Sequence, residues 1–349
     1  MLNLRTVKRT VCLFLAALML STSVTAWAED TIQLRMHTAS PGTSYFVVST
    51  TMQTVLQKSL PVKINLTSGM ASPRSALDAS SGQVDFYISS PAINQYMQTG
   101  TAMFANMPSA PELSEELRSV FNFPTGPYHI VTYADSGIES LDDIKGKRVF
   151  LGPPGGSATT TALGIIEAAT GFEPGEDFEQ SRLDWSSGQQ AFQDRQVDLM
   201  IIPTEMPSAL ISQFALLNDI RLIGLSEDDI KTPRMQEILG IVGRTIERIP
   251  PDLYGDSQAN DGSVVAIGAW AGIGTHAGVE EEIVYKVTKT IFENIKAFHQ
   301  AADWMKVITL ETALSEMNVP LHAGAYRYYK EAGVEVPSDL IPPGVKDKL

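Results

Sequence analysis

The chain of 349 residues is 44% hydrophobic and 19% charged, a composition that provides a sizeable core and excludes a disordered protein. Its 26 Lys and Arg residues stand against 40 Asp and Glu, and the net charge of −14 disfavours broad nucleic-acid or anionic-membrane surfaces, because both need clustered cations. At roughly 150 residues per domain, this length predicts about two domains.

Residues 1–28 are typical of a cleavable secretory signal peptide. They combine a basic start, an apolar stretch over residues 11–20 and a small-x-small cleavage site at Ala26-Trp27-Ala28. A retained membrane anchor is the alternative, although the apolar stretch is shorter than the ~20 residues that a span needs. Cleavage removes the only cysteine, Cys12, and three basic residues, which leaves 23 basic against 40 acidic residues and a net charge of −17. We therefore expect a periplasmic protein without disulfides, held together by its core.

After the signal, apolar strand-like runs alternate with Gly/Pro/Ser turns and with segments of helical period. This order is typical of α/β architecture. The predicted strands are residues 32–36, 62–66, 84–88, 129–133, 148–151, 199–202 and 221–225. The predicted helices are residues 45–58, 75–80, 159–169, 188–195, 206–216 and 279–301.

Two stretches, residues 76–91 and 191–203, follow the same order of a helix, the tripeptide Gln-Val-Asp, an apolar strand and a Pro-containing loop. Each is preceded by a strand, a small-residue turn and a helix start. The similarity predicts a duplicated α/β unit and two lobes that face each other, with the ligand outside the carboxyl ends of the strands. Chance similarity is the alternative, because Val-Asp before a buried strand is common.

The crossovers between the two units set the predicted domain boundaries. The first crossover lies in the Pro/Gly-rich stretch 123–128, and the second is expected after Leu225, in the charged segment that ends at Lys231. Lobe 1 is then discontinuous, with residues 29–133 and 229–349, and lobe 2 comprises residues 134–228. Two such crossovers form a hinge, which closes the lobes on a ligand.

The turn at residues 152–159, Gly-Pro-Pro-Gly-Gly-Ser-Ala-Thr, is the sharpest local signal for ligand binding. Backbone N–H groups and the start of the following helix suit a carboxylate or a phosphate. The turn matches neither established phosphate loop, and simple helix capping by its hydroxyls is the alternative. The candidate ligand-binding residues in this turn are Gly155, Gly156, Ser157, Ala158 and Thr159.

Two further turns and two strand ends supply short polar groups with few charges, a pattern that suits selective hydrogen bonding of a small polar solute. Arg74 is the favoured cationic candidate for a carboxylate, ahead of Arg35 and Arg182, because an arginine can form two parallel bonds to that group. The candidate residues of this set are Thr43, Ser44, Tyr45, Ser68, Gly69, Met70, Arg74, Ser89, Ser90, Thr204 and Glu205.

Catalytic signals are weak in this sequence. The chain after the signal has no thiol, no H-E-x-x-H and no G-x-S-x-G, and its five histidines lack metal-ligand spacing. We expect no enzymatic activity, no cofactor and no metal site. A secreted hydrolase is the minor alternative.

Several short stretches follow one another in the order found in a known receptor family. They are Gly42-Thr43-Ser44-Tyr45, residues 134–138, residues 141–149, Gly152-Pro153-Pro154-Gly155, Phe292-Glu293-Asn294, residues 320–325, Tyr328-Tyr329, Glu331 and Gly333. By their order, over nearly the whole chain after the signal, the protein resembles the TAXI-type solute receptors of tripartite ATP-independent periplasmic (TRAP) transporters.

The resemblance implies an α/β, two-lobe periplasmic binding protein fold with a hinge and an interlobe ligand cleft. It implies a monomeric receptor that captures a small organic anion, a carboxylate or amino acid such as glutamate or 2-oxoglutarate, and delivers it to a TRAP membrane component. A sensory module that presents the same kind of solute to a membrane kinase is the alternative. The family usually shows Gly-Gly-Ser-x-x-Asn where residues 68–73 read Ser-Gly-Met-Ala-Ser-Pro, so Met70 and Pro73 replace polar side chains and indicate a different solute.

Overall fold

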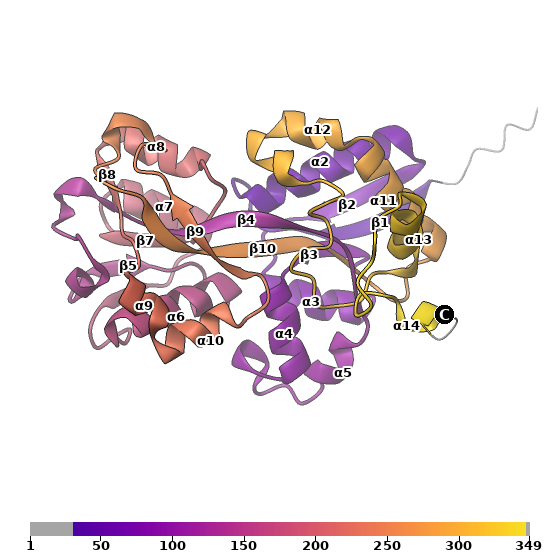
Figure 1. Cartoon of the computed structure of the whole chain (residues 1–349), viewed down its shortest axis with the longest axis horizontal. Coiled ribbons are helices and arrows are strands. Elements are labelled where there is room, and N and C mark those ends of the chain that lie inside the picture. Colours follow the sequence, from indigo (N-terminus) through magenta and orange to yellow (C-terminus); the bar gives the residue numbers. More distant parts are fainter. Residues whose placement is uncertain (1–30, 347–349) are drawn as a thin grey trace, which may run out of the picture. The chain divides into compact units, whose positions relative to one another are not determined.

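Strands and helices alternate along residues 31–346, the part of the chain that the computed structural model describes (Figure 1). The predicted signal peptide lies outside the described residues. The strands are β1 Ile32–His37, β2 Val62–Thr67, β3 Phe86–Ser89, β4 Leu117–Tyr133, β5 Arg148–Phe150, β6 Glu179–Ser181, β7 Leu199–Pro203, β8 Ile220–Leu222, β9 Arg244–Ile249 and β10 Val264–His276. The α-helices are α2 Ser44–Ser59, α3 Ser72–Ser80, α4 Pro91–Thr99, α5 Ala110–Ser114, α6 Ser157–Thr170, α7 Trp185–Gln193, α8 Ala209–Leu217, α9 Glu227–Lys231, α10 Pro233–Leu239, α11 Glu281–Glu293, α12 Ile295–Ala301, α13 Ala323–Glu331 and α14 Pro343–Lys346.

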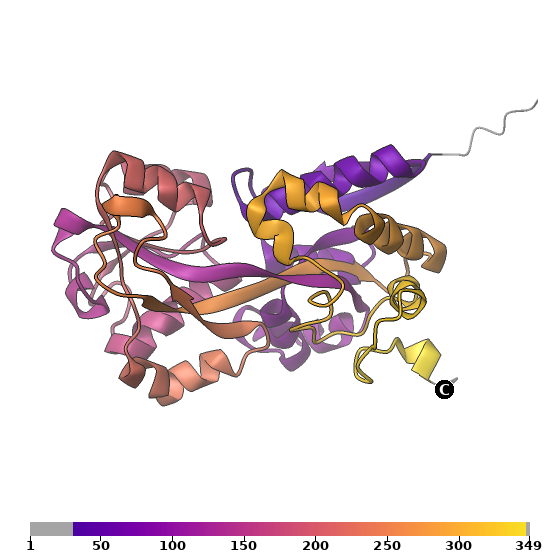
Figure 2. The same cartoon turned by 45° about the horizontal axis from the view of Figure 1, so that its top comes forward.

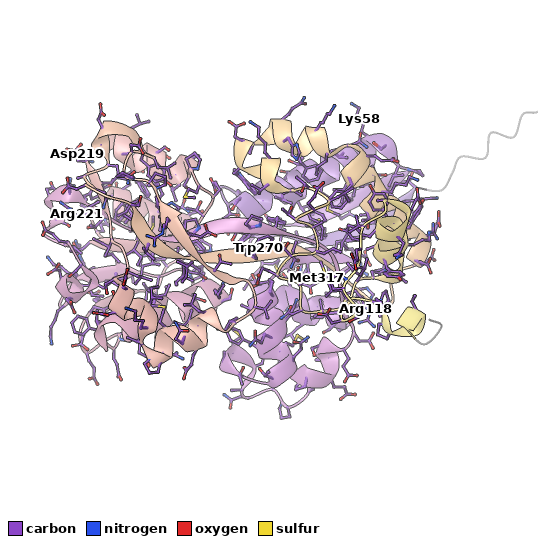
Figure 3. The ribbon with its side chains drawn as sticks, viewed as in Figure 1. Lys58, Arg118, Asp219, Arg221, Trp270 and Met317 are labelled. Atoms are coloured by element: carbon purple, nitrogen blue, oxygen red, sulfur yellow. The ribbon has the colours of Figure 1, made fainter. Side chains whose placement is uncertain are left out.

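Two long antiparallel strands, β4 and β10, run through both lobes of this fold (Figures 1 and 2). In lobe 1, β10 pairs with β3, and the sheet continues to β1 and β2. In lobe 2, β4 pairs with β7 and β8, and the sheet continues to β5 and β6. The register of the β4–β10 pair shifts between Ala269 and Trp270, which places a bend between the lobes. Figure 3 labels Trp270 at this crossing.

The sequence predicts only residues 129–133 of β4 and none of β10, because glycine interrupts the apolar pattern of β10. Close packing within the sheet leaves no room for a side chain at two of these glycines. A Cβ on Gly272 would lie 2.1 Å from Oδ1 of Asn122, and a Cβ on Gly274 would lie 2.6 Å from the ring of Tyr87. Glycine in a strand interior marks such a close approach, so a hydrophobic-run criterion misses this strand.

The duplicated unit is visible in the structure at a constant spacing of 113 residues. α2 begins at Ser44 and α6 at Ser157, α3 begins at Ser72 and α7 at Trp185, and β3 begins at Phe86 and β7 at Leu199. In both units the strand that opens the unit is parallel to the strand that follows the second helix. The two halves of the fold are therefore built from the same βαβαβ plan.

Each unit contains an equivalent arginine–aspartate ion pair that joins its first strand to the residue before its last strand. In the first unit Asp85, from the Gln-Val-Asp tripeptide, accepts hydrogen bonds from Nε and Nη2 of Arg35 at 3.1 and 2.6 Å. In the second unit Asp198 accepts from Nε and Nη2 of Arg148 at 3.0 and 2.7 Å. Each aspartate also accepts from the backbone N–H of its arginine, so the tripeptide ties the two parallel strands of its unit together.

The hydrophobic contacts of residues 229–268 are with lobe 2, although the sequence assigns this segment to lobe 1. Met235 and Ile238 of α10 lie in one core cluster with Ile165 of α6, and Ile249 and Val264 lie in another with residues of β7. The backbone N–H groups of Val242 and Gly243 donate to Gln95 and Glu316 of lobe 1, and the chain enters lobe 1 along β10. From this packing we propose that the second crossover lies on β10 rather than near residue 228.

The helix expected over residues 279–301 is divided in two. α11 ends at Glu293 and α12 begins at Ile295, because Asn294 leaves the helical conformation at φ −112° and ψ 22° and its side chain donates to the carbonyl of Thr290. Within residues 31–346, no helix combines the length and the apolar character that crossing a membrane requires.

Candidate ligand-binding site

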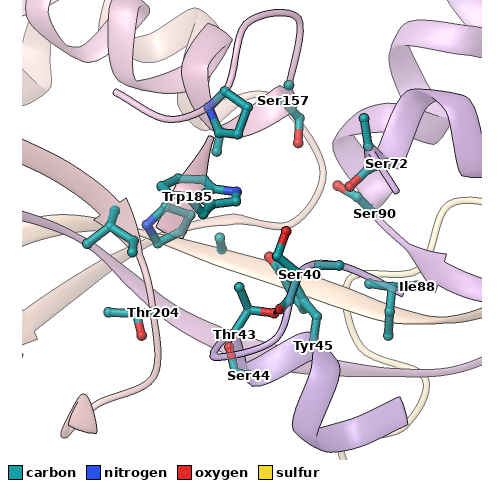
Figure 4. Close-up of a pocket in the computed structure, with 18 of the residues that line it drawn as sticks. Ser40, Thr43, Ser44, Tyr45, Ser72, Ile88, Ser90, Ser157, Trp185 and Thr204 are labelled. Carbon is teal, nitrogen blue, oxygen red and sulfur yellow. Dashed lines mark hydrogen bonds between the residues drawn. The ribbon is translucent and has the colours of Figure 1, made fainter. Parts of the chain in front are cut away.

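A cavity of about 230 Å³ lies between the two lobes and is lined by both copies of the repeated unit (Figure 4). Five helices have their first residue at it: Ser44 of α2 and Ser72 of α3 from lobe 1, and Ser157 of α6, Trp185 of α7 and Ala209 of α8 from lobe 2. Figure 4 shows Ser157 facing Ser72 and Ser90 across the opening, with Trp185 beside them. Helix N-termini carry partial positive charge, so their convergence favours an anion.

The start of α6 presents uncapped backbone donors to the cavity. Gly156 occupies the N-cap position and supplies no side chain, and within the described chain no protein acceptor is found for the N–H of Ser157 or Ala158. The hydroxyl of Thr159 donates to the carbonyl of Pro153 at 2.7 Å and so holds the turn in place. Capping of α6 by a hydroxyl of this turn is the alternative considered from the sequence. The structure shows no such hydrogen bond at the start of α6.

The start of α2 is capped by its own residue and offers different groups. Thr43 accepts from the N–H of Phe46 and donates to the carbonyl of Ser40, so its hydroxyl is occupied. Tyr45 reaches the cavity beside Thr125, and burial raises the pKa of its phenol to about 12. Tyr45 is therefore a neutral hydroxyl at physiological pH.

Most of the residues predicted from the sequence meet at this cavity, and four do not line it. Ser68 is exposed on its turn, and Gly155 and Thr159 shape the α6 turn from behind. Arg74 lies away from the cavity wall, because its guanidinium pairs with Asp78 on the same helix at 2.8 Å and its side chain is 62% exposed. The predicted residues that line the cavity are Thr43, Ser44, Tyr45, Gly69, Met70, Ser89, Ser90, Gly156, Ser157, Ala158, Thr204 and Glu205.

The other two arginines considered from the sequence are also absent from the cavity wall. Arg35 forms the structural pair with Asp85, and Arg182 lies exposed on lobe 2. The cation at the cavity is Arg244, the first residue of β9, which the sequence analysis missed because it predicts no element there.

Arg244 is a buried cation without an acidic partner. Only 7% of the residue is exposed; its Nη2 donates to Thr161 Oγ1 of α6 at 2.7 Å, and its guanidinium lies 5.4 Å from the ring centre of Tyr128. Its Nε is buried and has no hydrogen-bond partner. No ion pair joins it to a carboxylate of residues 31–346. Since a buried charge requires a partner, Arg244 is poised for an anionic ligand.

Two carboxylates also reach the cavity, and both are engaged by protein groups. Asp184 caps α7 by accepting from the N–H of Ser187 at 2.8 Å, and these hydrogen bonds lower the pKa of its carboxyl. Glu205 accepts from the hydroxyl of Thr204 at 2.7 Å. Neither carboxylate neutralises Arg244.

The aromatic wall of the cavity comes from Trp185 and Trp270. Trp185 stands edge-on to Phe150, with ring centres 5.5 Å apart, and its ring passes so close to Gly152 that a Cβ there would lie 2.8 Å from it. Trp270 follows the register shift in β10, and its backbone N–H donates to the carbonyl of Gly243. Both rings line the cavity and offer apolar faces to a ligand.

The residues described here contain no cluster of three or more histidine, cysteine, aspartate or glutamate side chains that could hold a metal ion. The donors of the lining residues include hydroxyls, backbone N–H groups, the amide of Gln189, the indoles of Trp185 and Trp270, and the guanidinium of Arg244. This donor set is suited to hydrogen bonding and charge pairing with an organic solute.

Comparison with known proteins supports this description of the fold. A sequence model of the NMT1-like family matches residues 36–333. The chain is similar to the solved structure of periplasmic binding protein BugD, with 12% identity, coverage of 87% of this chain and 98% of that one, and a TM-score of 0.53. It is also similar to a structure described as a periplasmic transporter, with 14% identity, coverage of 88% and 94%, and a TM-score of 0.51. These similarities show the two-lobe α/β fold of periplasmic binding proteins.

Proposed function

The chain belongs to the NMT1-like family, and from that premise we propose that it is a periplasmic receptor that captures a small organic anion between its lobes and delivers it to a membrane transporter. The observation that carries this proposal is Arg244, a buried guanidinium at the cavity without a protein carboxylate to balance it. A bound carboxylate would supply the missing charge and accept the unused donor.

The position of the cavity fits capture by closure. β4 and β10 connect the lobes, and the cavity lies beside their crossing at Tyr128, Ala269 and Trp270. A rotation about these two strands brings the serines of lobe 1 toward Arg244 and α6 of lobe 2. Hinge closure around a ligand is a common function of this type of connection.

The type of transporter and the class of solute are proposed from the sequence resemblance. The resemblance to TAXI-type receptors supports a TRAP transporter as the partner and a carboxylate or amino acid such as glutamate or 2-oxoglutarate as the class of solute. The signal-like residues 1–28 support export to the periplasm. The neighbours BugD and the periplasmic transporter, by their descriptions, are consistent with this location.

Ligand-induced thermal stabilisation tests the proposal. The purified exported protein, freed of co-purified solute by unfolding and refolding, is screened against a panel of organic acids. A ligand at 100 times its dissociation constant adds about 2.7 kcal/mol to the free energy of unfolding, which raises the melting temperature by several degrees. Failure of every acid to do so would contradict the proposal.

The variant Arg244→Gln connects the binding to the site. We expect affinity for the best acid to fall roughly 10- to 100-fold, because a hydrogen bond to a charged group contributes about 1.5–3 kcal/mol. Arg182→Gln is the matched control, since it removes the same charge from an exposed position outside the cavity. Equal affinity in the two variants would place the anion elsewhere.

A further inference from the structure

The charges at the cavity are distributed unequally between the two copies of the repeated unit. Among the residues described, the lining contributed by lobe 1 (residues 39–45, 69–72 and 88–90) contains no charged side chain. The charged lining residues are Arg244, Asp184 and Glu205, all in lobe 2. The matched positions show the difference directly: Ala71 and Ser72 begin α3 where Asp184 and Trp185 begin α7.

The two groups that favour an anion lie next to each other. Arg244 is bonded to Thr161, which is one helical turn after Ser157 on the same face of α6. The guanidinium and the free N–H groups at the start of α6 are therefore about one helical turn apart along α6, a spacing at which both can reach the same anionic group. A second carboxylate on the ligand would find no cation in the lining and would share the cavity with Asp184 and Glu205.

Lobe 1 offers uncharged hydrogen-bonding groups to the rest of the ligand. The hydroxyls of Ser40, Ser44, Ser72 and Ser90 line the cavity, and no hydrogen bond from them to another protein group is found within residues 31–346. The rings of Trp185 and Trp270 line the same cavity. This wall suits a body that has an apolar face and neutral oxygen or nitrogen atoms at its edge.

We infer that the solute carries a single charged group: one carboxylate held on lobe 2 by Arg244 and the start of α6, and an uncharged body that meets the serines of lobe 1 on closure. This inference rests on the proposed function and narrows it. It disfavours solutes with two carboxylates, glutamate and 2-oxoglutarate included. It also gives an order of events, because the charged head can dock on lobe 2 before lobe 1 closes over the body.

Matched pairs of acids test the inference on the full exported protein. Each pair keeps the carbon skeleton and replaces one carboxylate by a hydroxymethyl group: 5-hydroxypentanoate against glutarate, and 4-(hydroxymethyl)benzoate against terephthalate. These pairs are placed within the wider panel of mono- and dicarboxylates, and dissociation constants are measured by calorimetry. We expect the tightest acid of the panel to carry one carboxylate and to bind at least about tenfold better than its dicarboxylate partner.

The results of these measurements distinguish failure of this inference from failure of the proposed function. If a dicarboxylate binds more tightly than its monocarboxylate partner and Arg244→Gln loses that binding, the inference of a single carboxylate is wrong, whereas the proposed receptor function is still supported. Absence of binding by every acid overturns both.

A charge variant gives a second readout that does not depend on the best ligand. Asp184→Asn removes one of the two acids from the cavity and keeps a good N-cap for α7. It should reduce the preference for the monocarboxylate severalfold by improving dicarboxylate binding. Asp142→Asn, an equal change of charge at an exposed position away from the cavity, should leave the preference unchanged. An unaltered preference in Asp184→Asn would also count against the inference.

Discussion

The buried histidine His129 makes the stability of lobe 2 dependent on pH. His129 lies on β4 and is fully buried; its Nε2 lies 2.6 Å from the hydroxyl of Tyr254, and its Nδ1 lies 3.1 Å from the carbonyl of Pro127. Burial lowers the pKa of its imidazole to about 4. The folded protein therefore holds this side chain neutral over the whole range in which a free histidine gains its proton.

The sign and the size of the effect follow from linkage. An unfolded chain binds the proton with a pKa of about 6.5, whereas the folded chain resists it down to about 4, so stability falls as the pH drops through this window. The shift of about 2.5 units limits the loss to about 3.4 kcal/mol, and at pH 5 the loss relative to pH 8 is about 2 kcal/mol.

Urea unfolding at pH 8 and at pH 5 measures this loss in the wild type and in His129→Gln. We expect the variant to lose about 2 kcal/mol less than the wild type between the two pH values, because it has no proton to gain at this position. Tyr254→Phe should keep the pH dependence, since burial and not the tyrosine hydrogen bond lowers the histidine pKa. The same pH dependence in the wild type and in His129→Gln would refute the reasoning.

Two further substitutions test the crossing strands and the repeated ion pair. Gly126→Ala should lower the melting temperature by several degrees and weaken ligand binding, because Gly126 has φ +91° and its new Cβ would lie 2.1 Å from the carbonyl oxygen of Thr204. Gly255→Ala is the control. Gly255 has φ +75° but lies in open space, so this variant should lose only about 1 kcal/mol of stability in urea unfolding. Asp198→Asn should lower the free energy of unfolding in urea by about 1 kcal/mol, a modest value because the side chain of its partner Arg148 is 41% exposed. An unchanged free energy of unfolding would show that the backbone hydrogen bonds alone hold these strands together.

The repeated unit is the part of the fold that can be predicted most fully from the sequence. The two Gln-Val-Asp tripeptides mark equivalent positions, and the turns before them lead to the helix starts that line the cavity. Local chemistry suffices for this prediction, because small residues and glycines at a strand-to-helix turn have few other uses. The domain boundary is harder, since it depends on residues such as Ile238 and Ile249, whose apolar side chains do not specify which lobe they pack against.

The arginines favoured from the sequence do not line the cavity, and their ion pairs explain why. Arg35 and Arg148 occupy equivalent positions in the two units and are each balanced by the aspartate of the repeat. Arg74 has an acid four residues later on its own helix. An arginine that recurs with the repeat, or that has an acid one helical turn away, is thus already satisfied by the chain itself.

Arg244 meets neither condition, because it lies outside the repeated unit and reaches α6 only through tertiary packing. The repeat alone gives a cavity of matched turns, helix N-termini and hydroxyls, with no cationic side chain among the lining residues that it contributes. The segment between the second unit and β10 adds the one cation to that wall. In the function that we propose, the cation that selects an anion therefore comes from the inserted segment. Exchange of β9 between related receptors should change the charge of the solute that is bound while the scaffold of paired turns is kept.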